Sequence, residues 1–179
     1  MKISVSGIIG SGKSSVAKIL AEKLKYNYYS VGGFMREIAL KRGISIHELS
    51  KLAEKTIELD EELDNMQKNL NNKDNLVMDS RLGFYFLPSS YKIFLIVSLD
   101  EAARRILDAK RGDEPYSNLE ECEEYIKTRA NSEKIRYKQY YNIDFPNLSD
   151  FDLVIDTTNK PIEEVIEEIL RKVEERKGI

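Results

Sequence analysis

Residues 7–14 read Gly7-Ile8-Ile9-Gly10-Ser11-Gly12-Lys13-Ser14, which matches the spacing G-x-x-x-x-G-K-[ST]. The apolar residues Ile3 and Val5 come just before it and predict a short buried strand. Apolar residues at helical spacing follow it and predict a helix over Lys13–Leu24. Glycine allows successive backbone N–H groups to turn inward, and the first turn of a helix carries partial positive charge. The segment is therefore predicted to be a phosphate-binding loop.

A loop of this kind holds the phosphates of a nucleoside triphosphate. We expect Lys13 to reach the β- and γ-phosphates of ATP and Ser14 to bind Mg²⁺. The predicted ATP-binding residues of the loop are Gly7, Ile8, Ile9, Gly10, Ser11, Gly12, Lys13, Ser14 and Ser15. The loop alone does not separate kinases from ATPases or GTPases.

The rest of the chain alternates buried strands with amphipathic helices. Further strands are predicted over Asn27–Val31, Asn75–Asp79, Lys92–Ser98 and Asp152–Asp156. Helices are predicted over Phe34–Lys41, Ile44–Asn71, Asp100–Lys110, Leu119–Tyr140 and from Pro161 onward, with Asp100 as a cap. This order predicts an α/β fold of the P-loop NTPase type, a five-stranded parallel sheet with helices on both faces.

The bulk composition limits the class of protein. The 179 residues carry a net charge of -3, with 41% hydrophobic and 33% charged residues, which fits one globular domain without a large basic face. The single cysteine permits no internal disulfide, and no apolar run approaches the roughly 20 residues of a membrane span. We expect a cytoplasmic monomer without a nucleic-acid or membrane partner.

Three charged residues follow predicted strands, where a parallel sheet faces its ligand crevice. Asp79 ends the third strand and is expected to hold Mg²⁺ or its water shell. Arg36 and Arg81 offer planar guanidinium groups that fit the phosphate of an acceptor molecule. A surface or ion-paired arginine is the alternative for either residue.

A long charged helix is predicted between the fourth and fifth strands. Its residues Arg129 and Arg136 are seven apart and therefore share a helix face. Closure of this insert over the phosphates would neutralise charge in the transition state, so both arginines are predicted to be catalytic together with Lys13. Arg111 enters the same insert from the preceding loop. A solvated charged helix explains most other charges of the segment.

The chain resembles the nucleoside monophosphate kinase family, in its archaeal cytidylate kinase form. The resemblance rests on residues 7–14, 30–36, 58–64, 79–82, 129–141 and 149–157. It implies a core (1–31, 73–110, 142–179), an arm that binds the monophosphate (about 32–72) and a short lid (about 111–141). It also implies that ATP and CMP or dCMP give ADP and CDP or dCDP. Such proteins often have proline where this chain has Ile9 and an acidic residue where it has Gly33.

The same resemblance places further residues near the two substrates. It implies that Arg105 or Arg111 lies near the base or phosphates of ATP, and that backbone near residues 157–160 contacts adenine. A carboxylate is a natural partner for the exocyclic amino group of cytosine, and Asp60 and Asp64 are four apart on one helical face of the arm. An ordinary acidic surface helix explains that pair equally well.

Two other readings remain open at this stage. The first is a kinase of the same fold that phosphorylates AMP, UMP or a small metabolite. The second is a nucleotide-dependent switch or assembly ATPase, which would hydrolyse ATP slowly without an acceptor.

Overall fold

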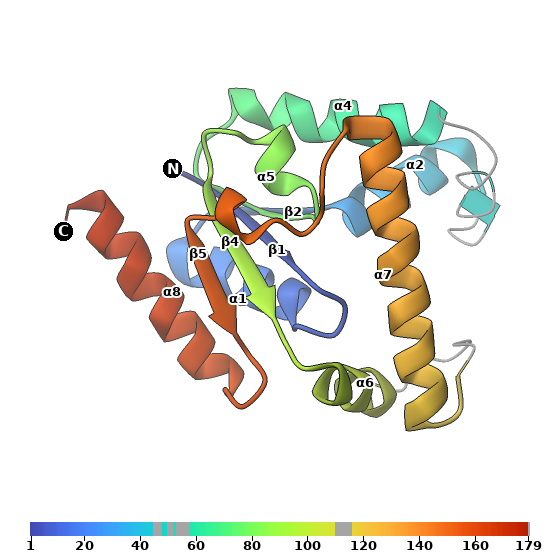
Figure 1. Cartoon of the computed structure of the whole chain (residues 1–179). Coiled ribbons are helices and arrows are strands. Elements are labelled where there is room, and N and C mark those ends of the chain that lie inside the picture. The colour runs from blue at the N-terminus through green and yellow to red at the C-terminus, as the bar shows by residue number, and fades with distance from the viewer. Residues whose placement is uncertain (45–47, 50–51, 53–57, 110–115, 179) are drawn as a thin grey trace. The chain divides into compact units, whose positions relative to one another are not determined.

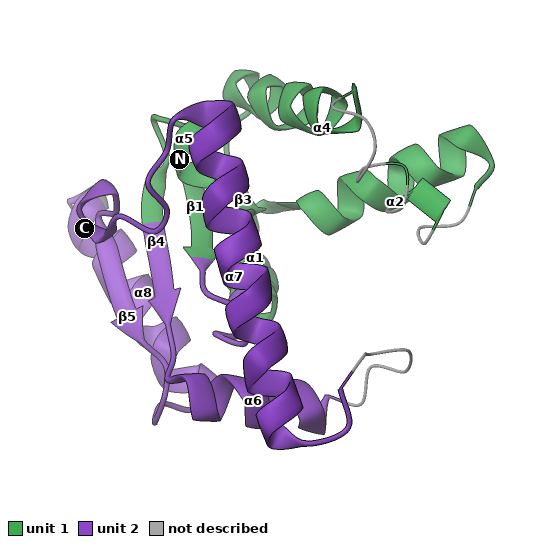
Figure 2. Ribbon diagram, turned by 45° about the vertical axis from the view of Figure 1, so that its right-hand side comes forward, with its two compact units in different colours: residues 1–6, 14–92 green, residues 7–13, 93–179 purple. Residues whose placement is uncertain are grey.

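A computed structural model of the chain describes residues 1–44, 48–49, 52, 58–109 and 116–178. The chain divides into two compact units, which are coloured separately in Figure 2. Unit 1 contains residues 1–6 and 14–92, and unit 2 contains residues 7–13 and 93–179. The phosphate-binding loop belongs to unit 2 up to Lys13, whereas Ser14 begins the second segment of unit 1.

Five strands make up the sheet, in the order β2-β3-β1-β4-β5 (Figure 1). Their bounds are β1 Lys2–Gly7, β2 Asn27–Ser30, β3 Leu76–Asp79, β4 Tyr91–Ile96 and β5 Leu153–Asp156. In unit 1, β1 and β2 both pair with β3 in parallel; in unit 2, β4 pairs with β5 in parallel. The predicted fold class, with a five-stranded parallel sheet, is confirmed.

The described residues form seven α-helices and two short 3₁₀ turns. The helices are α1 Lys13–Leu24, α2 Val31–Arg42, α4 Glu58–Asn69, α5 Gly83–Phe86, α6 Leu99–Asp108, α7 Leu119–Tyr141 and α8 Ile162–Lys177. The 3₁₀ turns are η1 Leu70–Asn72 and η2 Leu148–Asp150. The one-turn helix α5 was not predicted, because four residues are too few to show helical periodicity.

Two helix starts differ from the sequence prediction. Helix α2 begins at Val31 rather than Phe34, because the Ser30 hydroxyl accepts a hydrogen bond from the Gly33 amide and caps the first turn. Helix α6 begins at Leu99, and its cap is Ser98 rather than the predicted Asp100. In both cases the serine directly before the helix caps it, and the helix therefore begins earlier than predicted.

Each unit has an apolar core of its own. In unit 1, helices α2 and α4 bury Phe34, Ile38, Leu59 and Leu63 in one cluster with residues of β3. In unit 2, α6 and α7 pack together through small residues, including Ala103 and the fully buried Cys122. Burial of this kind is the main stabilising contribution to such a fold. Each unit is therefore stabilised by the burial of its own apolar side chains.

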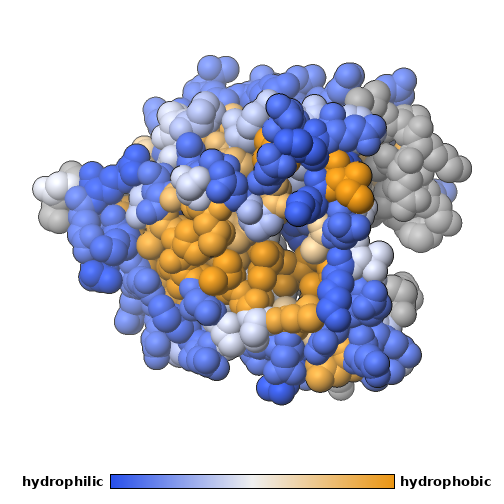
Figure 3. Space-filling model, viewed as in Figure 1, coloured by the Kyte–Doolittle hydropathy of each residue, from blue (hydrophilic) through white to orange (hydrophobic). Residues whose placement is uncertain are grey.

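Polar and charged residues cover most of the helices in the view of Figure 3, and apolar residues gather over β4 and β5. Val154 on β5 and Leu148 beside it are 37% and 45% exposed. None of the helices in the described ranges combines the length and the apolar character that a membrane crossing requires.

Candidate functional site

The loop between β1 and α1 has the backbone of a phosphate-binding turn. Gly10 and Gly12 have φ values of +80° and +79°, in the left-handed region that glycine adopts without steric cost. The Ser11 amide donates to the Ile8 carbonyl at 3.2 Å, and the Ile8 amide donates to Leu95 on β4 at 3.1 Å. These bonds fix the turn directly before α1, so its remaining amides can face an anion at the positive end of that helix.

The two left-handed glycines differ in their surroundings. A Cβ atom on Gly10 would lie 2.6 Å from the Cβ and 2.7 Å from the Cα of Ala102 on α6, whereas one on Gly12 would meet nothing within 4 Å. Gly10 is therefore required for backbone conformation and for close packing, but Gly12 for conformation alone.

We expect Gly10→Ala to lower stability more than Gly12→Ala. The change at Gly12 adds only the left-handed strain, about 1–2 kcal/mol. The change at Gly10 adds the same strain and an overlap with the α6 backbone that no side-chain rotation relieves. Thermal unfolding of the two variants measures the difference. Equal melting temperatures would show that α6 does not pack on the loop as described.

Thr157, which follows β5, connects the end of the sheet to the loop. Its hydroxyl oxygen lies 3.3 Å from the Ser11 carbonyl and 3.0 Å from the Ile96 carbonyl, and its amide donates to Ile96 at 2.9 Å. The Ser11 hydroxyl is buried and has no hydrogen-bond partner among the described residues. The backbone of the loop is therefore anchored at Ser11 by Thr157, another residue of unit 2.

Arg105 on α6 fixes the segment after β5. Its guanidinium donates to the Thr157 hydroxyl at 3.0 Å and to the carbonyls of Thr157 and Thr158, and it pairs with Glu101 at 2.9 Å. The edge of the guanidinium is therefore occupied by protein groups. A direct hydrogen bond from Arg105 to an ATP phosphate would have to replace one of them, whereas its planar face is compatible with stacking on a base.

The Thr158 hydroxyl and amide both donate to Asp156, at 2.6 and 2.9 Å, and these bonds lower the pKa of the Asp156 carboxyl. A lowered pKa means that the contribution to stability is present above the ordinary pKa and is lost as the pH falls through the lower value. At neutral pH the Asp156 carboxylate is ionised, and its hydrogen bonds from Thr158 hold the turn after β5 in place.

In unit 1, the carboxyl ends of β2 and β3 lie at the same level. Ser30 is the register partner of Asp79, which in turn pairs with Val5 on β1. Asp79 is only 5% exposed, and the Tyr28 hydroxyl donates to its Oδ2 atom at 3.0 Å. A buried carboxylate at the carboxyl end of a parallel strand has the chemistry that Mg²⁺ prefers. Ser14 lies in that first turn and is exposed.

Tyr28 is a positioning residue for Asp79. We expect Tyr28→Phe to raise the Mg²⁺ concentration needed for half-maximal stabilisation at fixed ATP about tenfold. Residues that hydrogen-bond to metal-ligating carboxylates have effects of this size on metal affinity. Tyr29→Phe is the matched control, since the Tyr29 hydroxyl accepts from Lys73 instead. Melting temperature measured against Mg²⁺ concentration at fixed ATP gives the readout. Identical curves for both variants would remove Tyr28 from the site.

The two predicted acceptor arginines have different surroundings. Arg36 lies on α2 and is exposed; a guanidinium nitrogen is 3.9 Å from the place where a side chain on Gly32 would begin. No ion pair to Arg36 occurs within the described residues. Arg81 is half-buried, and its carbonyl accepts from the Ser6 hydroxyl at 3.0 Å. Its backbone is therefore anchored to β1.

Helix α4 carries the predicted base-reading pair. Asp60 and Asp64 are both half-buried, one turn apart, while the neighbouring Glu58 and Glu61 are exposed. An ion pair between Arg42 and Glu62 joins α2 to α4. Glu62 on the same helix is also half-buried, so partial burial alone does not separate the aspartates from an ordinary acidic surface helix.

Helix α7 is continuous over 23 residues, as predicted. Arg129 pairs with Glu133 at 3.3 Å, and the Arg136 guanidinium lies 5.5 Å from the centre of the Tyr137 ring. Both arginines are exposed. Arg111 lies outside the described residues. The structure therefore leaves the predicted lid role of these residues as a prediction.

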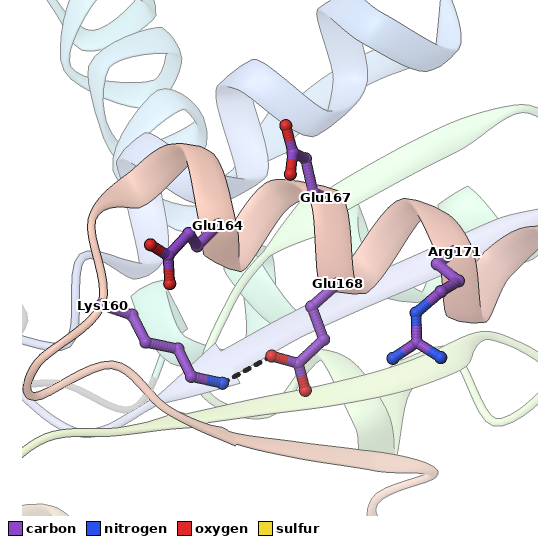
Figure 4. Close-up of a pocket in the computed structure, with 5 residues that line it drawn as sticks. All are labelled: Lys160, Glu164, Glu167, Glu168 and Arg171. Atoms are coloured by element: carbon purple, nitrogen blue, oxygen red, sulfur yellow. Dashed lines mark hydrogen bonds and ion pairs between the residues drawn. The ribbon is translucent and has the colours of Figure 1, made fainter.

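A pocket of about 360 Å³ borders helix α8, and the described residues that line it are charged (Figure 4). Lys160 and Glu168 form an ion pair across it at 2.6 Å, and Glu164, Glu167 and Arg171 complete the lining. None of these side chains was a predicted site residue.

Sequence reasoning missed the side-chain roles of Thr157 and Tyr28. Tyr28 precedes Ser30 by two residues on β2, so the two side chains point to the same face of the sheet. That alternation was a usable signal. The hydrogen bonds from the Thr157 hydroxyl to Ser11 and Ile96 join segments distant in the chain, and no local sequence pattern predicts them.

A glycine-rich turn between a parallel strand and a helix, with a buried aspartate ending another strand, defines the P-loop class of nucleotide-binding proteins. The model of the cytidylate kinase-like family matches residues 2–159. The chain belongs to this family.

Individual relatives agree with this assignment. A cytidylate kinase of Sulfolobus acidocaldarius is 39% identical over 173 residues, which cover 95% of this chain and 92% of that protein. An S-adenosylmethionine-dependent nucleotide dehydratase of Lacinutrix mariniflava is 35% identical over 180 residues, and the match covers 99% of this chain but only 37% of that protein. Shikimate kinase of Bacteroides thetaiotaomicron shares the fold, with a TM-score of 0.70, 16% identity and coverage of 97% and 98%.

Proposed function

We propose that the protein transfers the γ-phosphate of ATP to CMP or dCMP and releases ADP with CDP or dCDP. The single observation that carries this proposal is the match to the cytidylate kinase-like family over residues 2–159. Cytidylate kinases such as that of Sulfolobus acidocaldarius align over nearly the whole of both chains. The dehydratase name belongs to a much longer protein, so we assign no dehydratase chemistry to this chain.

The donor end of the site is the loop. Its amides and Lys13 hold the β- and γ-phosphates of ATP, and the segment after β5, which Arg105 holds at Thr157, lies against adenine. The bond from the terminal bridging oxygen to the γ-phosphorus breaks, and an oxygen of the acceptor phosphate forms the new bond in line with it. That phosphate oxygen is already anionic, so the attack needs no strong base.

The acceptor phosphate is assigned to Arg36 and Arg81. The first turn of α2 contains no acidic residue, and the Arg36 guanidinium lies over that turn beside Gly32. The positive end of the helix and the guanidinium charge therefore add at one place, which favours a dianionic phosphate.

The residues of unit 1 fit a magnesium ion. Ser14 offers a hydroxyl and Asp79 a carboxylate, and Mg²⁺ is commonly held by one or two such groups together with substrate phosphates and water. When bound, the ion would neutralise charge on the β- and γ-phosphates. Closure of the lid would bring Arg129 and Arg136 to the same phosphates and exclude water.

A coupled assay of ADP formation with CMP, dCMP, UMP, AMP and GMP tests the proposal. We expect the highest kcat/KM with CMP or dCMP, and hydrolysis without acceptor at a small fraction of that turnover. A preference for AMP would assign the protein to a kinase of the same fold with another acceptor. Acceptor-independent hydrolysis alone would favour a switch or assembly ATPase.

A further inference from the structure

Helix α4 contains a buried amide in a position that its pattern reserves for an apolar residue. Leu59 and Leu63 form its buried stripe, which Leu70 at the start of η1 continues, and Gln67 lies one turn after Leu63 with only 4% of its surface exposed. A buried polar side chain costs free energy unless it is hydrogen-bonded, so a leucine here would be the simpler choice for stability. The amide therefore calls for a reason other than packing.

The orientation of the Gln67 amide is fixed by Ser80. The Ser80 hydroxyl donates to Gln67 Oε1 at 2.6 Å. Ser80 itself is held on both sides, because its amide donates to Val5 at 3.2 Å and its carbonyl accepts from Ser6 at 2.9 Å. With its oxygen engaged, Gln67 presents its NH₂ group on the other side. Among the described residues, no other group is hydrogen-bonded to this side chain.

The same helix places Gln67 next to the predicted base-reading pair. Residues 60, 64 and 67 have the spacing i, i+4, i+7 and therefore share one face of α4. Asp60 and Asp64 are half-buried, and Gln67 lies at the border between them and the leucine stripe. One face thus carries carboxylate acceptors beside an amide donor of fixed direction.

We propose that Gln67 is a specificity-determining residue that reads the pyrimidine base of the acceptor, an inference that rests on the proposed function. Cytosine presents an amino donor at N4 beside an acceptor at N3, and uracil presents the reverse at both positions. The aspartate face accepts from N4, and the Gln67 NH₂ group donates to N3. A donor with fixed direction rejects the N3–H group of uracil, because two donors would face each other without a bond.

Three variants measure this role through the ratio of kcat/KM for CMP to that for UMP. We expect Gln67→Leu to lower the CMP value about 10- to 100-fold, the size of one lost buried hydrogen bond in a binding site, and to change the UMP value and the KM for ATP little. Gln67→Glu, of the same shape, should lower the ratio further, since a carboxylate would face the N3 lone pair. Ser80→Ala should lower it less, because the amide loses its orientation but not its donor.

Asn65→Ala is the matched control, since it removes an exposed amide from the same helix and should keep the wild-type ratio. Thermal unfolding of each variant separates folding from recognition. If Gln67→Leu does not fold, Gln67→Glu and Gln67→Met decide the question. A wild-type preference for CMP that survives in the folded Gln67 variants overturns the assignment of Gln67 alone. A wild type that does not phosphorylate CMP overturns the proposed function first, and the Gln67 assignment with it.

Discussion

Replacing Lys13 with alanine is expected to lower the turnover of phosphate transfer about 10³-fold while the protein stays folded. Lys13 directly follows Gly12, the second of the two left-handed glycines, and is the first residue of α1. Its ammonium group adds a full positive charge to the partial charges of the loop amides. The attraction between this charge and the transferred phosphate strengthens as negative charge develops in the transition state. Single-turnover measurements with saturating ATP and acceptor isolate this step.

Lys18→Ala is the matched control for Lys13→Ala. Lys18 is an exposed lysine on the same helix, more than one turn further along. The Lys18→Ala variant should transfer phosphate at the wild-type rate. Turnover of the Lys13 variant within tenfold of wild type, with an unchanged melting temperature, would contradict the assignment of the loop.

Replacing Arg36 with alanine is expected to raise the KM for the acceptor about 10- to 100-fold, the loss of one or two charge-assisted hydrogen bonds. The KM for ATP should change little, because Arg36 belongs to α2 and not to the loop that holds the triphosphate. Initial rates with one substrate varied at a time separate the two constants.

Arg42→Ala is the control for Arg36→Ala. Arg42 is on the same helix, but its guanidinium is already paired with Glu62. It should leave the acceptor KM near the wild-type value. A larger effect of the Arg36 variant on the ATP KM than on the acceptor KM would remove Arg36 from the acceptor site.

Much of the fold could be predicted because its signals are local. The spacing of Gly7, Gly10, Gly12 and Lys13 identifies the loop, and the apolar run of β4 identifies a strand covered on both faces. Helix starts were less accurate. Ser30 and Ser98 are capping residues, and the choice between them and a later start depends on a hydrogen bond rather than on periodicity.

The site was harder to predict because its supporting residues are distant in the chain. Asp79 was recognised from its place at a strand end, but Tyr28, which orients it, is 51 residues earlier. Gln67 and Ser80 are 13 residues apart and form one buried pair. A polar residue in the leucine stripe of α4 was the one sequence signal for that pair. Arg105 was predicted near ATP, and the structure adds that its guanidinium holds Thr157 and Thr158.

Transfer of a labelled γ-phosphate from ATP tests the central claim most directly. The protein is incubated with Mg²⁺, CMP and ATP that carries the label only in its γ-phosphate, and the products are separated. We predict that the label appears in the β-phosphate of CDP, in an amount equal to the ADP formed. Label found as free phosphate, with CMP unchanged, would contradict the account.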